Sequence, residues 1–174
     1  TSAISTPSGS SFPVFGLGSH FVLDGSLEIK GSKDIAMFGR LGASYGSRAE
    51  SLAILESLLE IGRMLNSLAV EEILEMSLSD QLELQSQDII ALGKVVNDGM
   101  PFVLETNRAV DILQALAMKK KFDLNLVLVS VEEAPMVLDK LKESNTPVII
   151  DPMDNIPNSF DELGSSLSLG KILD

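Results

Sequence analysis

Polar residues able to do chemistry follow each of three short apolar runs in the second half of the chain. The runs span 102–104, 124–129 and 147–150, and the residues that follow them are Glu105, Thr106, Asn107, Arg108, Ser130, Glu132, Glu133, Asp151, Asp154 and Asn155. Two carboxylates that face one cleft can hold a hard cation or divide the roles of acid and base, and Glu105 and Asp151 suit this best. The alternative is structural, with Asp151 and Asn107 capping loops and helices.

Two further residues have both a chemical and a structural interpretation. Arg108 either pairs with Glu105 or Asp111, or binds an anionic substrate through two hydrogen bonds. His20 lies in a Gly-rich loop at 16–20, where a lone histidine is a surface residue, a general acid–base or a single metal ligand.

The three apolar runs alternate with segments of helical periodicity. This alternation predicts right-handed βαβ crossovers and a parallel sheet, with ligands bound at the carboxyl ends of the strands. Because the runs are apolar throughout, we expect strands that are buried on both faces. Ser130 and Glu133 have the spacing of a capping box, which predicts a helix that begins there, with Glu132 and Glu133 favouring its N-terminus. A doubly wound sheet and an arc of a (βα)₈ barrel both fit, although a closed barrel needs about 250 residues.

The first part of the chain is organised differently. Residues 1–48 are rich in Gly and Ser and form a strand-and-loop segment, with strands expected at 2–5 and 36–38. Residues 49–100 form a helical segment with helices at 49–65, 69–76 and 86–97, and residues 101–174 hold three βα units. The last of these ends in a helix near 159–172, with a break at 164–166. We expect one domain overall, and an incomplete one, because the chain does not begin with Met.

Composition excludes several classes of function. The 174 residues are 45% hydrophobic, which is enough to build a core. With 13 basic against 25 acidic residues the net charge is −12, so neither nucleic acid nor an anionic membrane surface is an expected partner. No apolar run approaches the roughly 20 residues of a membrane-spanning helix. The absence of Cys rules out disulfides and thiol chemistry, and it leaves the cellular compartment open.

Two stretches of the sequence resemble the imidazolonepropionase-like branch of the amidohydrolase superfamily. They are Asn-Arg-Ala-Val-Asp-Ile at 107–112 and Pro-Val-Ile-Ile-Asp-Pro-Met-Asp-Asn-Ile-Pro-Asn-Ser-Phe-Asp at 147–161. The resemblance is best over 85–174, weaker over 1–25 and slight between 40 and 84. It implies a metal-dependent hydrolase with a (βα)₈ barrel, in which a metal-activated hydroxide attacks a C–N bond, commonly that of a cyclic or linear amide. Zinc is the divalent metal that it implies.

Only part of the family's site falls within this sequence. The resemblance implies a His-x-His pair upstream and a late catalytic Asp downstream. The strand end that often bears a His ligand in related sequences has Glu105, and the next strand end has Ser130. Glu105 is therefore a candidate metal ligand in a site that is poor in the imidazoles that zinc prefers. Asp151 and Asn155 match the motif as loop residues that shape the pocket.

The leading hypothesis is a segment of an amidohydrolase-like, metal-dependent hydrolase that acts on the C–N bond of a small non-peptide amide. Glu105, Asn107 and Arg108 would line the substrate side, with His20 in a loop over it. The alternative is a catalytically inactive homologue or scaffold fragment that binds a small molecule or a partner, which the missing histidines favour. Because an isolated arc of barrel leaves sheet edges unpaired, we expect association between copies or with the rest of the polypeptide.

Overall fold

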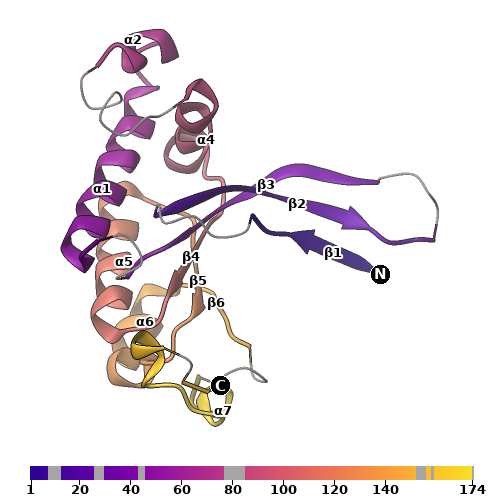
Figure 1. The fold of residues 1–174 in the computed structure, drawn as a ribbon, viewed down its shortest axis with the longest axis vertical. Coiled ribbons are helices and arrows are strands. Elements are labelled where there is room, and N and C mark those ends of the chain that lie inside the picture. Colours follow the sequence, from indigo (N-terminus) through magenta and orange to yellow (C-terminus); the bar gives the residue numbers. More distant parts are fainter. Residues whose placement is uncertain are drawn as a thin grey trace.

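The six strands of the described residues form one sheet, in the order β1-β2-β3-β4-β5-β6. The computed structural model describes residues 1–7, 13–25, 30–42, 46–76, 85–151, 156–157 and 159–173. The strands are β1 (Ser2–Ser5), β2 (Val14–Val22), β3 (Lys30–Arg40), β4 (Phe102–Thr106), β5 (Leu126–Ser130) and β6 (Val148–Ile149). The first three pair antiparallel, and β3 to β6 pair parallel. Figure 1 shows β1, β2 and the start of β3 as an arm that extends away from the parallel strands.

The arm formed by β2 and β3 is longer than the sequence predicted. The short strand expected at 36–38 is the end of β3, which has 11 residues and pairs with β2 over most of its length. Gly31 allows this close pairing, because a side chain there would collide with the backbone of His20. Gly16 and Gly18, which indicated a loop, therefore lie within β2.

Helices connect the parallel strands, as the alternation of patterns predicted. They are α1 (Arg48–Met64), α2 (Val70–Leu74), α4 (Ser86–Asn97), α5 (Ala109–Phe122), α6 (Leu138–Ser144) and α7 (Leu169–Leu173), with short 3₁₀ helices η1 (Ala134–Val137) and η2 (Phe160–Glu162). The helices expected at 49–65, 69–76 and 86–97 are confirmed to within two residues. The one expected near 159–172 is divided into η2 and α7, with the break at 163–168. Among the described residues, no helix has the length and hydropathy needed to cross a membrane.

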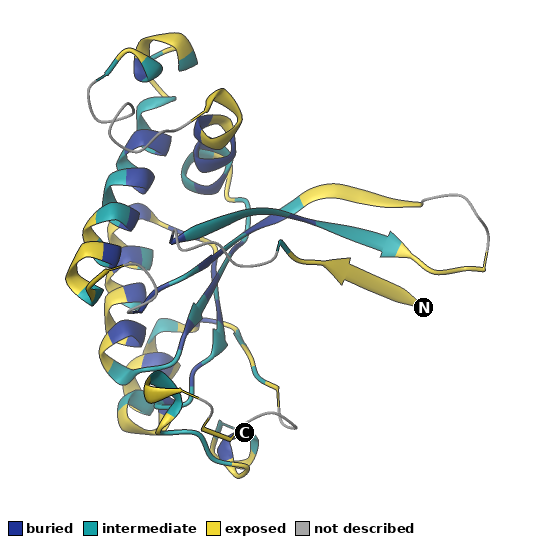
Figure 2. Ribbon diagram, viewed as in Figure 1, coloured by how far each residue is buried: buried dark blue, intermediate teal, exposed yellow. Residues whose placement is uncertain are grey.

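The helices lie on one side of the parallel strands (Figures 1 and 2). In β4, Phe102 and Leu104 are buried in the main core, whereas Val103 and Glu105 alternate with them and are only half-buried. The expectation that these strands are buried on both faces is therefore wrong for the described residues, because the described helices cover only one face. The result is a mixed α/β half-barrel of mostly parallel βα units, with a partly open inner face.

Candidate functional site

The carboxyl ends of β3 and β4 lie side by side and bring two opposite charges together. Arg40 and Glu105 are direct neighbours in the strand register, and Arg40 Nη2 lies 2.8 Å from Glu105 Oε2. Their side chains are 42% and 28% exposed, so the ion pair contributes at most about 1 kcal/mol to stability. The pair is accessible at the end of the sheet where parallel α/β folds bind their ligands.

A hollow of about 410 Å³ opens above this ion pair, and we call it the carboxyl-end cavity. Its lining comes from the ends of β3 and β4 and from the segment around η2, namely Arg40, Leu41, Gly42, Glu105, Asn107, Ser159, Phe160, Asp161 and Glu162. The Phe160 residue is 75% exposed, which is unusual for a large apolar side chain. The cavity therefore combines an ion pair, an amide, an exposed aromatic ring and two further carboxylates.

The wall formed by η2 is fixed to the barrel by Arg48. The Arg48 guanidinium pairs with Asp111 of α5 and with Asp161 of η2. Asp111 is buried, so without Arg48 its carboxylate would be a buried charge with no partner, which is strongly destabilising. A capping box at the start of α1 positions Arg48, because Ser47 accepts a hydrogen bond from the Glu50 backbone N–H at 3.1 Å.

Arg108 pairs with Glu133, not with the two partners that the sequence suggested. Its Nε lies 3.0 Å from Glu133 Oε1, and its guanidinium lies 5.5 Å from the centre of the Phe160 ring. Glu133 also accepts a hydrogen bond at 2.9 Å from the backbone N–H of Ala109, at the start of α5. Glu133 therefore supports the N-terminus of the preceding helix. Arg108 therefore contacts Phe160, a residue of the cavity wall, and is not itself among the residues that line the cavity.

The predicted capping box at Ser130 and Glu133 is wrong. Ser130 ends β5 with a φ of 75°, and the buried Val131 follows with a φ of 55°. Two consecutive left-handed residues turn the backbone sharply, and such strain is costly for a β-branched side chain. The turn is held by the hydrogen bond from the Val131 N–H to the Thr106 carbonyl oxygen at 2.9 Å, and α6 begins only after η1.

This turn places Glu132 among other carboxylates beside the cavity. Burial raises the pKa of Glu132, and the negative charges of Glu162, Glu105 and Glu133 raise it further, while a hydrogen bond from its own backbone N–H opposes the rise. Glu132 Oε2 is buried and has no hydrogen-bond partner among the described residues. A carboxyl group in such surroundings keeps its proton to a higher pH than usual.

Two other buried polar atoms, on residues that line the cavity, lack hydrogen-bond partners in the described part of the chain. They are Arg40 Nε, a donor, and Asn107 Oδ1, an acceptor. The backbone of Asn107 is fixed, because its carbonyl oxygen accepts a hydrogen bond from the Glu133 N–H at 2.9 Å. A donor and an acceptor therefore belong to two residues that line the same cavity.

The remaining predicted pocket residues that the structure describes do not line this cavity. His20 lies within β2 opposite Ser32, so the prediction of a loop at this position is wrong. Arg40 follows Ser32 by eight residues on β3, which puts roughly 26 Å of strand between His20 and the carboxyl end. Asp151 is exposed just after β6. Asn155 lies outside the described residues.

The described residues at the carboxyl end do not fit a zinc ion. Within the described ranges, no three His, Cys, Asp or Glu side chains are grouped so as to hold a metal. Glu105 has one oxygen engaged with Arg40, and no imidazole or thiolate accompanies it. The described residues do not test the predicted metal-ligand role of Glu105, and its ion pair with Arg40 argues against that role.

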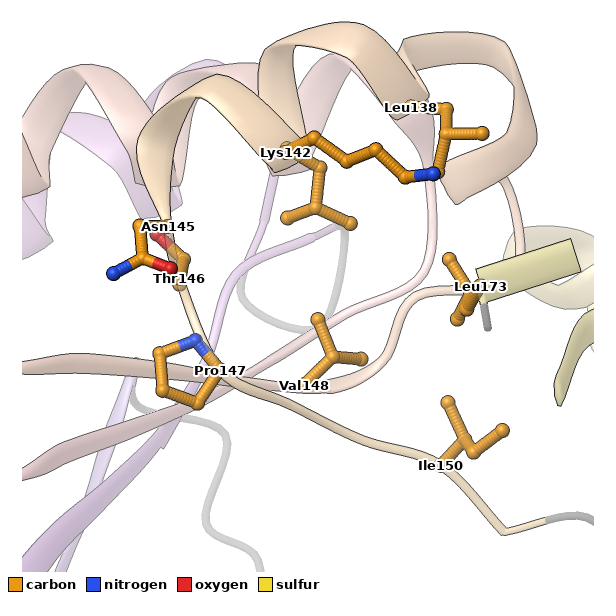
Figure 3. Close-up of a pocket in the computed structure, with 9 residues that line it drawn as sticks. Leu138, Lys142, Asn145, Thr146, Pro147, Val148, Ile150 and Leu173 are labelled. Atoms are coloured by element: carbon orange, nitrogen blue, oxygen red, sulfur yellow. The ribbon is translucent and has the colours of Figure 1, made fainter.

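A second hollow, of about 540 Å³, lies between α6 and β6 and carries little acid–base chemistry. It is lined by Leu138, Leu141, Lys142, Asn145, Thr146, Pro147, Val148, Ile150 and Leu173. Figure 3 shows Val148, Ile150 and Leu173 around one apolar space, with the Lys142 ammonium group extended toward Leu138. We call it the α6–β6 groove.

Comparison with known proteins supports the fold. No family model matches the sequence, and no curated protein matches it. A solved structure, described as an amidohydrolase from Thermotoga maritima MSB8, is similar over 99% of this chain with a TM-score of 0.78 and 20% sequence identity. The chain spans 48% of that protein's length. At this identity the likeness shows a shared fold, that of an amidohydrolase-type half-barrel.

Proposed function

We propose that this chain supplies the substrate-binding half of an amidohydrolase-like hydrolase, and that its carboxyl-end cavity holds the C–N bond of a small amide. The observation that carries the proposal is the pairing of Arg40 with Glu105 at the mouth of a hollow that Asn107 also lines. The fold shared with an amidohydrolase supports the same class of reaction.

The unpartnered atoms at the cavity match the two sides of an amide group. An amide carbonyl oxygen accepts a hydrogen bond, which Arg40 Nε can donate, and an amide N–H donates one, which Asn107 Oδ1 can accept. Both atoms are buried in the structure, so each side chain has to turn toward the cavity to meet the ligand. A small rotation about the last torsion of Asn107 presents its amide to the cavity at little cost. An amide ligand would satisfy both atoms at once, whereas an ester or a hydrocarbon would not.

Glu132 is suited to supply the proton that hydrolysis of an amide needs. Water adds its oxygen to the carbonyl carbon, the C–N bond breaks, and the leaving nitrogen takes a proton. A protonated Glu132 gives up that proton, and the attacking water returns one to the carboxylate. Its raised pKa keeps the proton to a higher pH than an ordinary glutamate does, and the negative charges of Glu162 and Glu105, which line the cavity, contribute to that rise.

No step of this proposal runs through a metal, because the described donor set does not suit zinc. A divalent metal, which the family resemblance implies, would take ligands from outside the described residues. The described residues contain no group of three side chains that could hold a metal, and this favours a second candidate function. In that function an inactive homologue binds the amide without cleaving it. Release of the amine product from a bound amide distinguishes the two.

Binding of a matched lactam and lactone tests the proposal. The probe 2-pyrrolidinone carries a cyclic amide, the kind of substrate that the imidazolonepropionase-like resemblance implies. The control γ-butyrolactone has a ring of the same size without an N–H. We expect the lactam to bind about tenfold more tightly in isothermal titration, because the lactone leaves Asn107 unpaired. Asn107→Leu should remove this difference in affinity between the two rings. Gln87→Leu, at an exposed position of α4, should keep it. Equal binding of both rings to the unmodified protein would overturn the proposal.

A further inference from the structure

We propose that the carboxyl-end cavity selects a neutral amide that carries a planar aromatic ring, with the ring packed against Phe160. This inference rests on the proposed function and narrows the substrate class of the same site. Arg40 and Asn107 bind the amide end of the ligand, and the charges and apolar surface of the lining determine what the rest of the ligand is.

The charges of the lining are already paired, which favours a neutral ligand. Glu105 pairs with Arg40 at 2.8 Å, and Asp161 pairs with Arg48. Glu162 also has an interaction of its own. A cation or an anion would therefore lose water on entering the cavity without gaining a free counter-charge from the lining, whereas a neutral ligand has much less hydration to lose.

Phe160 offers the ligand an aromatic surface. The residue is 75% exposed although it is large and apolar, and it lines the cavity. The Arg108 guanidinium lies over the ring, 5.5 Å from its centre, so it occupies one face at most and leaves most of the residue uncovered. A flat ring that packs on this surface removes apolar area from water and adds the stacking energy of two aromatic rings.

One ligand can meet both the polar and the apolar part of the lining. In a primary or a cyclic amide the carbonyl oxygen and an N–H lie on the same edge, so one end of the molecule offers both the acceptor for Arg40 and the donor for Asn107. A ring at the other end is then free to reach Phe160 of η2. The volume of about 410 Å³ lies within the range of small-molecule sites, about 300–1,000 Å³, and leaves room for a single-ring amide.

Two amides of similar size test the preference for an aromatic ring. Benzamide has a planar ring, whereas cyclohexanecarboxamide has the same amide group on a puckered ring, and each is titrated into the protein by calorimetry. We expect benzamide to bind about fivefold more tightly, because only a planar ring stacks on Phe160. Phe160→Leu should remove this preference, and Phe160→Tyr should keep it. Leu167→Ala, at a position that is 71% exposed and outside the cavity lining, should leave it unchanged.

Two charged analogues of benzamide test the preference for a neutral ligand. Benzamidine is a cation and benzoate is an anion, and both keep the ring. We expect each to bind about tenfold more weakly than benzamide, because the charged groups of the described lining already have partners. Either analogue binding as tightly as benzamide would contradict the inference.

The outcomes separate this inference from the proposed function. Equal binding of benzamide and cyclohexanecarboxamide would overturn the preference for an aromatic ring and leave the amide site standing. Failure of benzamide to bind where 2-pyrrolidinone binds would do the same. A preference for benzamide that survives Phe160→Leu would place the ring elsewhere and contradict the inference. Failure of both amides and of 2-pyrrolidinone would overturn both proposals.

Discussion

Arg48 at the start of α1 forms an ion pair with Asp161 of η2, although 113 residues separate them in the sequence. The same guanidinium pairs with the buried Asp111 of α5. This contact brings Phe160 and Glu162 to the ends of β3 and β4, so that the cavity is built from segments that lie far apart in the sequence.

Replacing Arg48 should weaken both the fold and the cavity. Arg48→Met leaves the buried Asp111 without its partner, and we expect a loss of about 2–4 kcal/mol in the free energy of unfolding. Urea denaturation followed by circular dichroism measures it, since the chain has no Trp. Lys140→Met breaks an exposed ion pair and should change stability very little. A loss no larger for Arg48→Met than for Lys140→Met would contradict the role assigned to Arg48.

Replacing Glu132 should stabilise the protein in a pH-dependent way. Burial and the neighbouring carboxylates raise the pKa of Glu132, so the folded state binds its proton more tightly than the unfolded state does. Stability from this group is therefore present at low pH and is lost as pH rises through the raised pKa. Glu132→Gln should raise the melting temperature at pH 7, and this gain should vanish at about pH 4, below the ordinary glutamate pKa. A gain that is the same at both pH values would show that the charge of Glu132 is not its cause.

The parts of the fold that the sequence predicted depend on local patterns. The three βα units were predictable from apolar runs and helical periodicity, and the break in the last helix from the Gly-Ser-Ser sequence at 164–166. The site depends on contacts between distant segments, such as Arg48 with Asp161, which no local pattern contains. The capping box at Ser130 failed because left-handed backbone at the end of β5 changes what Glu133 can reach.

The same distinction explains the errors about individual site residues. Glu105 and Asn107 were found because a strand end is recognisable from the sequence. Glu132 was assigned only a helix-terminal role, since its unusual surroundings arise from carboxylates on other elements. His20 was placed in a loop because glycine indicates turns, whereas in β2 and β3 it allows close strand pairing.

Metal analysis of a Glu105 variant tests the metal-ligand role. Because Glu105 Oε2 is engaged with Arg40, we expect Glu105→Ala to retain whatever divalent metal the unmodified protein carries, measured by elemental analysis after dialysis. Binding of 2-pyrrolidinone should fall about tenfold, because Arg40 loses the partner that orients it. Loss of metal in this variant, with the fold intact, would establish Glu105 as a ligand.

The partly open face of the sheet should promote association. The half-buried Val103, Val127 and Val129 lie on this face, and Ile149 of the edge strand β6 is 54% exposed. We expect species larger than one 18.7 kDa chain in light scattering at working concentrations, and Ile149→Lys should shift them toward the monomer. A strictly monomeric protein would contradict the prediction.

Nuclear magnetic resonance of the ¹⁵N-labelled protein titrated with 2-pyrrolidinone tests the central claim most directly. We predict that the backbone amide signals of Glu105, Asn107 and Phe160 move together and saturate, because these residues line the carboxyl-end cavity. Shifts confined to Val148 and Leu173 would place the ligand in the α6–β6 groove and contradict the claim. Signals that do not move at any concentration would contradict it as well.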